Sequence, residues 1–585
     1  MTRTPVERKN RGINPPAPTP PQDGRSFRFR PHLVDSLRGY TWGRFQADLF
    51  AGFTVGIVAL PLAIGFGIAA GASPAAGIYS AIIGGFIVSA LGGSRVQIGG
   101  PAGAFVGLIY LTIARYGLPN LLICTVMAGM ILFALGATRL GSLIKYIPHP
   151  VTTGFTCGIA ITIASTQVSD FLGLRTGPPP PFFVGKMVAL ARALPTASIP
   201  TLLLGLAAAA VIKFWPKPWG RRVPGSIVAV IAGTAIARLC HLPVVTIGER
   251  FGPAGIPQSL PAFHLISFDF TRVKDLFRPA VAIALLGSIE SLLSAVVADG
   301  MIDDRHDSNQ ELMAQGVANM TVPFFGGIPV TGVIARTATN IRSGATSPLA
   351  GIIHSLTLLA IVLVAAPLAR YIPLTVLGAV LIVVAYNMGE WDEFLLLKGQ
   401  PKSDAMVFLV TFGLTVLFDL TVAVEIGMIL AAFLFIKRIG DTTEVDALDR
   451  IASESGAFGH EQAPVMPQGV LVYRVFGALM FGGADKLDTI IRRAGGDTRV
   501  IVLHLSALIA MDATALNALE TLHEKLKRHG RYLLLSGAHA QPHAMMEKSG
   551  FLTRVGPANV VPNLAAAKTR AEQILGLPGR DSAWF

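Results

Sequence analysis

The stretch Val322–Ser343 (VPFFGGIPVTGVIARTATNIRS) limits what this chain can fold into more than any other segment. It lies in a hydrophobic region, yet it combines prolines and glycines with Arg336, which one continuous membrane-spanning helix does not tolerate. Lipid cannot satisfy free backbone N–H and C=O groups, so the stretch fits at membrane depth only beside other protein or a water-filled cavity. We therefore predict a broken helix whose second piece begins after Gly332.

The second piece places Arg336 about one turn inside its N-terminus. Free N–H groups and the positive end of the helix dipole meet there, which favours an anion. The alternative is an arginine at a helix end near the lipid headgroups, or a bent loop at the membrane surface.

Composition indicates a helical membrane protein with several spans. The chain has 585 residues, of which 52% are hydrophobic and 14% charged. Residues 1–44 hold nine Lys and Arg against three acidic residues around a proline-rich run, which predicts a cytoplasmic, disordered tail. The net charge of +13 is spread over this tail, loops and helix ends without an aromatic-interleaved patch, so nucleic-acid binding is not indicated.

About fourteen membrane segments are predicted. Because this number is even, the C-terminus lies on the same side of the membrane as the N-terminus, which is the cytoplasmic side. Two are half-helices at 97–113 and 331–343, and 312–325 is a short companion. The remaining apolar segments lie near 46–70, 74–91, 120–137, 150–168, 198–214, 224–240, 278–298, 347–368, 371–387, 403–418 and 421–437.

Two pairs of short motifs repeat along the chain. Lys145–Pro148 (KYIP) resembles Arg370–Pro373 (RYIP), and Pro101–Phe105 resembles Pro329–Val333, both at a separation of about 225 residues. We predict a duplication of seven segments, with the second copy inverted because seven is odd. Inverted halves with interrupted segments at matching places are typical of secondary transporters. Each pair taken alone could also arise by chance.

A soluble α/β domain follows the membrane part. We predict strands at 470–476, 499–505 and 531–536, and helices at 484–494, 513–529 and 541–549. The predicted domains are a tail (1–44), a first repeat (45–240), a connecting loop (241–277), a second repeat (278–438), a linker (439–466) and the α/β domain (467–575).

Three motifs and the C-terminal part resemble one known family. Ser73–Ala81 (SPAAGIYSA), Ser94–Ala104 (SRVQIGGPAGA) and Gly332–Asn340 (GVIARTATN) are similar to the sulfate permease (SulP, solute carrier 26) family of anion transporters. Residues 500–519 resemble a STAS domain, the cytoplasmic module that this family usually carries. The resemblance implies fourteen segments as two inverted sevens, a core and a gate domain, often a homodimer, and an elevator-like movement of the core. It also implies the inner membrane, with both termini cytoplasmic.

Arg336 is the first candidate site residue, since a guanidinium offers several donors in a fixed fork that suits oxyanions. Half-helix N-termini after Pro101 and Pro329 add partial positive charge. The backbone N–H groups expected at the anion belong to Ala102, Gly103, Ala104, Ile334, Ala335 and Arg336. By the resemblance, Phe66 lines the same pocket, although plain core packing explains it equally well. Leu62 stands where some relatives have glutamine.

Glu290 is the second candidate, because it lies in the middle of an apolar segment, where an ionised carboxylate is costly and faces the bundle interior. We interpret it as a proton acceptor that couples anion transport to protons; the alternative is a permanent tie to Arg336 or to backbone. Ser294 lies one turn later on the same face. In sodium-coupled bicarbonate members of the family the matching acidic and hydroxyl positions hold Na⁺, but there the position of Arg336 is not basic.

By the resemblance, Thr514 matches the phosphorylated position of bacterial STAS domains, but Ala513 and Ala515 replace the usual neighbours. Docking of a partner protein or support of a dimer is therefore the preferred interpretation. The sequence contains no phosphate-binding loop, no spacing typical of zinc ligands and no catalytic triad pattern. We therefore expect that the protein binds no cofactor or metal and is not an enzyme. The hypothesis is a proton-coupled transporter of sulfate, bicarbonate or a C4-dicarboxylate. The alternatives are a sodium-coupled bicarbonate transporter, a nucleobase permease and a membrane-anchored sensor or scaffold.

Overall fold

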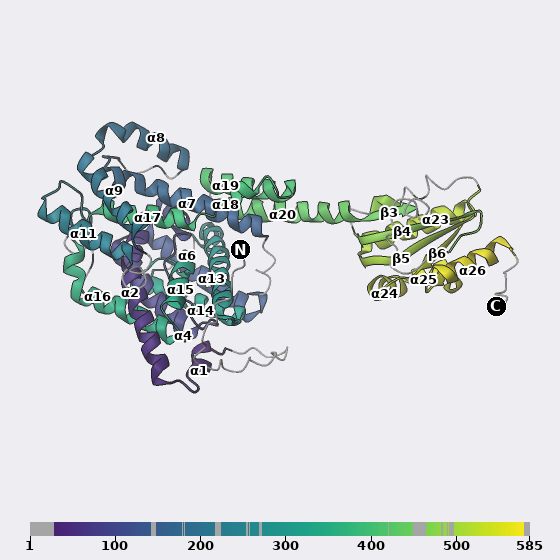
Figure 1. The fold of residues 1–585 in the computed structure, drawn as a ribbon, viewed down its shortest axis with the longest axis horizontal. Coiled ribbons are helices and arrows are strands. Elements are labelled where there is room, and N and C mark those ends of the chain that lie inside the picture. The colour runs from purple at the N-terminus through teal and green to yellow at the C-terminus, as the bar shows by residue number, and fades with distance from the viewer. Residues whose placement is uncertain are drawn as a thin grey trace, which may run out of the picture. The chain divides into compact units, whose positions relative to one another are not determined.

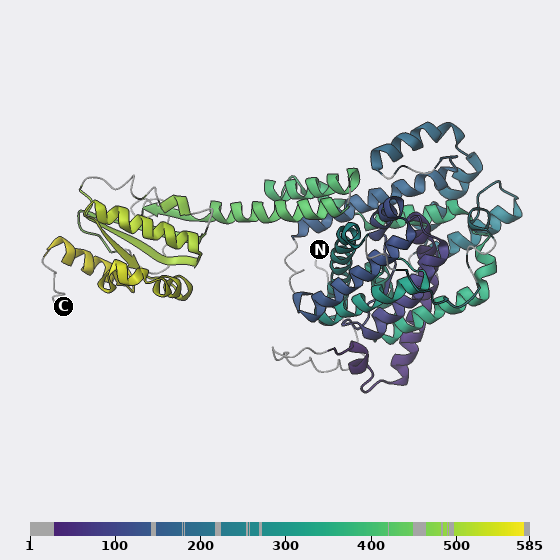
Figure 2. The same ribbon diagram turned by 180° about the vertical axis from the view of Figure 1, so that it is seen from behind.

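The computed structural model describes residues 29–141, 148–177, 180, 182–216, 224–252, 256, 258–267, 272–418, 420–447, 464–480, 484–487, 490 and 497–577. The chain forms two compact units. The first comprises residues 1–147, 155–393 and 412–423, and the second comprises 148–154, 394–411 and 424–585. The first unit contains most of the apolar helices, and the second contains the C-terminal α/β domain (Figures 1 and 2).

The first half of the membrane part begins with the 28-residue helix α2 (Trp42–Ala69). Next come α3 (Pro74–Tyr79), a π-helical turn (Ser80–Gly84) and α4 (Gly85–Leu91), which together cover 74–91 as predicted. The rest of this half consists of β1 (Gly99–Gly100), α5 (Phe105–Tyr116), α6 (Leu118–Ala137), α7 (His149–Leu172), α8 (Phe183–Ala193), α9 (Ile199–Phe214), α11 (Gly225–Leu239) and the short α12 (Ile247–Phe251).

The second half begins with the 30-residue helix α13 (Val273–Ile302) and repeats the order of a long helix, a second helix, a two-residue strand and a half-helix. It contains α14 (Ser308–Thr321), β2 (Thr331–Gly332), α15 (Ile334–Arg342), α16 (Leu349–Ala369), α17 (Leu374–Met388), α18 (Asp392–Leu396), α19 (Lys402–Leu417) and α20 (Leu420–Thr442). Most of the motif Lys145–Pro148 lies outside the described residues, so the structure does not test that repeat.

Most of the predicted segments begin and end within a few residues of a helix, but the interrupted ones differ. Residues 97–104 are not helical, and α5 begins only at Phe105. The companion predicted at 312–325 is a helix from Ser308 to Thr321, followed by the 3₁₀ turn Val322–Phe325. Its polar first turn hid its start from a search for apolar residues.

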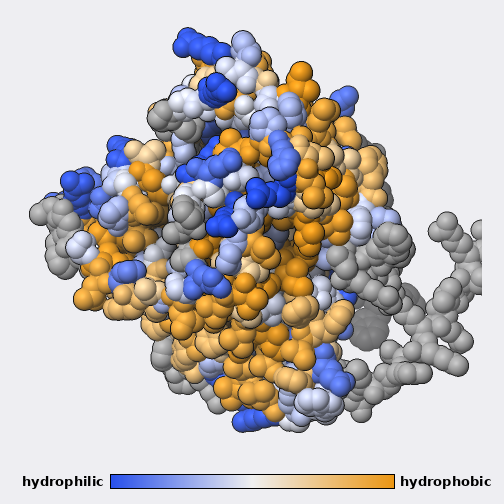
Figure 3. Space-filling view, turned by 90° about the vertical axis from the view of Figure 1, so that its left-hand side faces the viewer, coloured by the Kyte–Doolittle hydropathy of each residue, from blue (hydrophilic) through white to orange (hydrophobic). Residues whose placement is uncertain are grey.

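Seven helices in the described part are long and apolar enough to cross a membrane. The count becomes eight if Phe183–Thr196 and Ile199–Phe214, bent by 116° at their junction, form one span. Large hydrophobic side chains such as Leu203, Ile231 and Val364 are exposed on α9, α11 and α16. Figure 3 shows the face of the molecule nearest these helices, where hydrophobic residues predominate. Such a surface suits contact with lipid.

The C-terminal domain is a five-stranded sheet in the order β3–β4–β5–β6–β7. β4 (Val470–Leu479), β5 (Val500–Met511), β6 (Tyr532–Ser536) and β7 (Val560–Val561) are parallel neighbours. Ile501 and Leu503 pack on one face with α23 (Ala513–Arg528), α24 (Ala540–Lys548) and α25 (Phe551–Val555). Val500 and Val502 pack on the other face with α26 (Leu564–Leu575).

The predicted linker 439–466 needs a correction. It contains β3 (Glu444–Ala447), which pairs antiparallel with β4 and therefore belongs to the sheet. A four-residue strand with two acidic residues carries too little apolar pattern to be recognised before its partner is known. The helix predicted at 484–494 falls mostly outside the described residues; Ala484–Leu487 form a 3₁₀ turn.

Gly77 marks the tightest crossing of α2 and α3. A Cβ at this position would overlap the carbonyl oxygen of Ala63, a backbone atom that cannot move aside cheaply. We expect Gly77→Ala to lower the thermal unfolding midpoint of the detergent-solubilised protein by several degrees. The control is Gly300→Ala in α13, where an added Cβ meets nothing within 4 Å and alanine favours the helix. Equal stability of the two variants would contradict this close crossing.

Candidate functional site

The two interrupted segments meet in a short antiparallel pair. Gly99 of β1 pairs with Gly332 of β2, and Gly100 pairs with Thr331. The N–H of Val333 also donates to the carbonyl of Ile98 at 2.9 Å. α15 begins directly after β2, and α5 begins five residues after β1, so the N-termini of both half-helices lie beside this pair. The strand pair therefore joins the two interrupted segments, each of which leads into a half-helix.

Polar side chains satisfy the backbone of the interrupted segments. The amide of Asn319 in α14 brackets Val330, accepting from its N–H at 2.9 Å and donating to its carbonyl at 2.8 Å. Asn340 donates to the carbonyl of Val96 at 2.9 Å, and the Thr337 hydroxyl accepts from the N–H of Ile98 at 3.1 Å. These bonds meet the requirement that non-helical backbone at membrane depth be satisfied by protein.

Arg336 is 1% exposed and lies against the first interrupted segment. Its Nη2 donates to the carbonyl of Pro101 at 3.1 Å, while Nε and Nη1 have no hydrogen-bond partner in the described structure. A buried guanidinium is stable only when its charge and donors are met. Nε–H and Nη1 point to different sides of the guanidinium, so each free donor suits an oxyanion that neighbouring backbone N–H groups also bind.

Backbone N–H groups at both half-helices add to this site. No side chain caps α5 or α15, so their first N–H groups are not used by a cap. Ala102, Gly103 and Ala104 are buried, whereas Ile334 and Ala335 are exposed on the first turn of α15. All six predicted contact residues thus lie at the two N-termini, although the accessibility of the two groups differs.

Phe66 of α2 is 3% exposed, and its ring lies beside Gly103, just before α5 begins. A Cβ added to Gly103 would lie 3.3 Å from the Phe66 ring and 2.8 Å from Cδ1 of Ile163. Leu62, one turn earlier in α2, is also buried. The structure therefore brings Phe66 to the predicted anion contacts, as an apolar wall beside Gly103.

Glu290 is 6% exposed and lies on the face of α13 that meets β2 and α15. The carbonyl of Gly287 accepts a hydrogen bond from Thr331 at 2.9 Å, and the hydroxyl of Ser294 is bonded to that of Thr337 at 3.1 Å. Positions 287, 290 and 294 share one helix face. No ion pair within 4.0 Å joins Glu290 to Arg336, and no hydrogen bond of Glu290 is present among the described residues. Among the described residues, the alternative of a permanent contact from Glu290 to Arg336 or to the backbone is therefore not found.

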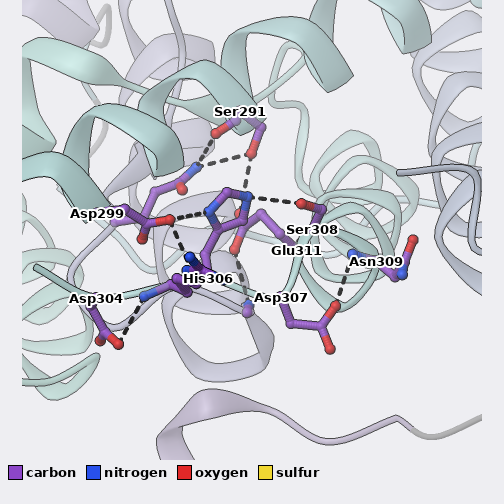
Figure 4. A network of polar contacts seen from close by, with 11 residues as sticks. Ser291, Asp299, Asp304, His306, Asp307, Ser308, Asn309 and Glu311 are labelled. Carbon is purple, nitrogen blue, oxygen red and sulfur yellow. Dashed lines mark hydrogen bonds and ion pairs between the residues drawn. The ribbon is translucent and has the colours of Figure 1, made fainter. Parts of the chain in front are cut away.

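Glu311 is a buried carboxylate that sequence reasoning missed. It accepts hydrogen bonds from the N–H of Gly93 at 3.0 Å, the Ser291 hydroxyl at 3.2 Å and the Gln315 amide at 3.0 Å (Figure 4). Because the apolar segment was predicted to begin at residue 312, Glu311 fell just outside it. Three donors already hold this carboxylate, so its arrangement is that of a structural group joining α13, α14 and the end of α4.

The turn between α13 and α14 is fixed by a second set of polar contacts. Nδ1 of His306 is 2.7 Å from the Asp299 carboxylate, and Nε2 is 2.9 Å from the Ser308 hydroxyl (Figure 4). Asp307 caps α14 by accepting from the N–H groups of Asn309 and Gln310. These contacts hold the start of α14, from which Asn319 reaches the interrupted segment.

Thr514 is exposed in the first turn of α23, where Asp512 caps the helix by accepting from the N–H of Ala515 at 2.8 Å. It belongs to the C-terminal domain and stays a separate prediction from the residues around Arg336.

Comparison with known proteins identifies the two parts of the chain. Residues 45–411 match the family model described as the sulfate permease family, and residues 464–567 match that of the STAS domain. The putative sulfate transporter YvdB of Bacillus subtilis (strain 168) is 38% identical over 531 residues, covering 89% of this chain and 96% of YvdB. The bicarbonate transporter BicA of Picosynechococcus sp. is 31% identical over 533 residues, covering 88% and 92%.

Solved structures agree with this assignment. The transmembrane domain of a cyanobacterial bicarbonate transporter BicA superposes with a TM-score of 0.59 at 30% identity, covering 67% of this chain and 98% of that one. The murine solute carrier 26 family member A9, solved in the inward-facing state, superposes with a TM-score of 0.82 over 92% and 94% of the chains. At 19% identity the latter shows the fold alone.

Gly100 offers a test of the position of Arg336. A Cβ at Gly100, whose φ is +151°, would lie 2.5 Å from Nη1 of Arg336. We expect Gly100→Ala to displace the guanidinium and to reduce any rise in thermal unfolding midpoint that is measured on adding sulfate or bicarbonate. The control is Gly107→Ala in α5, where the added Cβ lies 3.5 Å from Thr162 and fits. An unchanged anion effect in Gly100→Ala would place the anion elsewhere.

Proposed function

Because the chain belongs to the sulfate permease family, we propose that it is a secondary active transporter that carries a small oxyanion across the membrane. The anion binds between the N-termini of α5 and α15, at a donor of Arg336 that has no partner in the described structure. The observation that carries this proposal is a buried guanidinium with two unpartnered nitrogens beside two half-helix N-termini. The family consists of transporters, so the chain is not proposed to be an enzyme.

The names of the relatives point to sulfate and bicarbonate as candidate substrates. YvdB is named as a putative sulfate transporter and BicA as a bicarbonate transporter. Both anions present oxygen atoms that accept hydrogen bonds from a guanidinium and from backbone N–H groups. We propose sulfate as the first substrate, with bicarbonate and C4-dicarboxylates as the alternatives within the same site.

Protons are the proposed coupling ion. Glu290 lies on the face of α13 that meets β2 and α15, without a fixed partner in the described structure, so its carboxylate is available to take up and release a proton. The hydroxyls of Ser294 and Thr337 bond to each other nearby. Arg336 adds a fixed positive charge to this region, which disfavours a sodium ion there.

The wider arrangement follows the family. We propose a homodimer in the inner membrane with cytoplasmic termini, an elevator-like movement of the core, and a STAS domain that docks a regulatory protein. A nucleobase permease would not need an unpaired buried guanidinium at its site. A sensor or scaffold would not depend on that guanidinium at all, so variants of Arg336 separate these hypotheses.

Arg336→Ala is expected to reduce uptake of labelled sulfate or bicarbonate into proteoliposomes by at least about tenfold, since hydrogen bonds to a charged group contribute about 1.5–3 kcal/mol. Arg342→Ala, which removes an exposed arginine of the same helix, is the control and should transport normally. Normal uptake by both variants would support the sensor or scaffold hypothesis and contradict transport through this site.

Glu290→Gln is expected to keep anion binding but to lose the acceleration of uptake by an inward proton gradient, because the amide cannot take up the proton. Uptake is measured in proteoliposomes with and without the gradient. Glu311→Gln serves as the control: its carboxylate is already held by three donors, so we expect lower thermal stability with the proton dependence intact. Wild-type uptake that ignores the gradient would rule out proton coupling.

A further inference from the structure

A cavity of about 350 Å³ lies between the end of α7, the helix α8 and the outer part of α5. Its walls carry polar groups on α7 from Ser165 to Asp170, and Tyr110 of α5 faces Lys186 of α8 across it. A volume of this size holds an anion together with several water molecules. None of the residues predicted for the site at Arg336 lines this cavity.

Lys186 is the unusual group in this cavity, because only 6% of it is exposed. Its Nζ lies 5.3 Å from the centre of the Tyr110 ring, a cation–π contact. Within the part of the chain that the structure describes, its ammonium has no ion pair and no hydrogen-bond acceptor. A buried ammonium carries three donors and needs a counter-charge.

The fold holds Lys186 in this position through α8. Leu190, one turn after Lys186, packs with Leu174 and Ala193, and Val168 and Leu172 of α7 lie against the same cluster. Because positions 186 and 190 share a helix face, the packing that seats Leu190 also turns Lys186 inward. The side chain is therefore not free to extend into bulk water.

The other charges of the cavity cancel. Arg250 of α12 donates two hydrogen bonds to the Asp170 carboxylate, at 2.9 and 2.7 Å, so these two residues form a neutral pair. Among the lining residues only Asp170, Lys186 and Arg250 are charged, which leaves one net positive charge on Lys186. An uncompensated positive charge inside a polar cavity attracts an anion.

A smaller cavity of about 40 Å³ adjoins the first one. It shares Tyr110, Thr166 and Lys186 with the larger cavity, and it also touches Ala104 and Gly107 of α5. Ala104 is one of the residues whose N–H groups are proposed to bind the anion. The two cavities therefore follow α5 from the Asp170–Arg250 pair to its N-terminus.

We propose that Lys186 forms a second, outer anion-binding site, which holds a small oxyanion on its way to or from Arg336. This inference rests on the proposed transport function. The hydroxyls of Ser165 and Thr166 already donate to the carbonyls of Thr162 and Ile163, at 2.6 and 2.7 Å, so one ammonium supplies most of the binding. Such a site binds weakly enough to release its anion, as a step along a transport route requires.

The first test compares initial uptake rates of labelled sulfate and bicarbonate in proteoliposomes. We expect Lys186→Gln to raise KM about fivefold or more with Vmax little changed, and Lys186→Arg to restore most of the affinity. Arg192→Gln, which removes an exposed cation of the same helix, is the matched control. If Lys186→Gln does not fold, Lys186→Met is used in its place, because methionine keeps an unbranched aliphatic side chain without the charge. A KM equal to the wild-type value in these variants overturns the inference, while loss of uptake in Arg336→Ala still supports the transport function.

The second test detects binding without transport. In Arg336→Ala, which removes the inner site, sulfate should still raise the thermal unfolding midpoint, and the additional change Lys186→Gln should abolish that rise. No rise in Arg336→Ala alone overturns the outer site.

Uptake is also compared in phosphatidylcholine vesicles with and without phosphatidylglycerol. An effect of Lys186→Gln in both vesicles supports a free anion, and an effect confined to anionic lipid shows that Lys186 binds a lipid phosphate instead.

Discussion

The requirement that every backbone N–H and C=O at membrane depth find a partner governs the centre of this protein. Two segments leave the helical conformation there, and they satisfy part of their need by pairing Gly99 and Gly100 with Gly332 and Thr331. The rest is met by side chains such as Asn319, whose amide serves both backbone groups of Val330. Polar residues on apolar helices are thus structural supports for an interrupted backbone, and the half-helix N-termini become available because of them.

Buried charge is used sparingly and in two different ways. The buried carboxylate of Glu311 is held by three protein donors, and the more exposed pair Asp170–Arg250 is held by its own two hydrogen bonds, which makes them parts of the scaffold. Arg336 and Lys186 are also buried, but in the described structure two guanidinium nitrogens of Arg336 have no hydrogen-bond partner and the ammonium of Lys186 has no ion pair. Burying a charge without a partner is costly, and for this reason we propose that an anion binds at each of these two residues. The positive ends of α5 and α15 reinforce this at Arg336.

Sequence reasoning worked best where a pattern is local. The helix over 74–91 is found at its predicted limits, and the strands β4 and β6 begin within one residue of prediction. It also singled out Arg336 and Glu290, both of which are buried, because a charge within an apolar segment stands out without any knowledge of the fold. It failed at Glu311 and at β3, which lie at the edges of their segments and carry a polar rather than an apolar pattern. It also paired Pro101 with Pro329, although Pro101 follows β1 and Pro329 precedes β2.

The sequence by itself determined the membrane class, the broken segment around Arg336, the family and the presence of a C-terminal α/β domain. Each of these depends on hydrophobicity, residue type or spacing within a few turns of chain. Only the tertiary structure decided that Arg336 contacts Pro101, that Glu290 lacks an ion pair with Arg336, and that Lys186 faces Tyr110 across a cavity. These facts depend on how helices far apart in the chain rotate and pack against one another, and no local pattern of residues encodes that rotation.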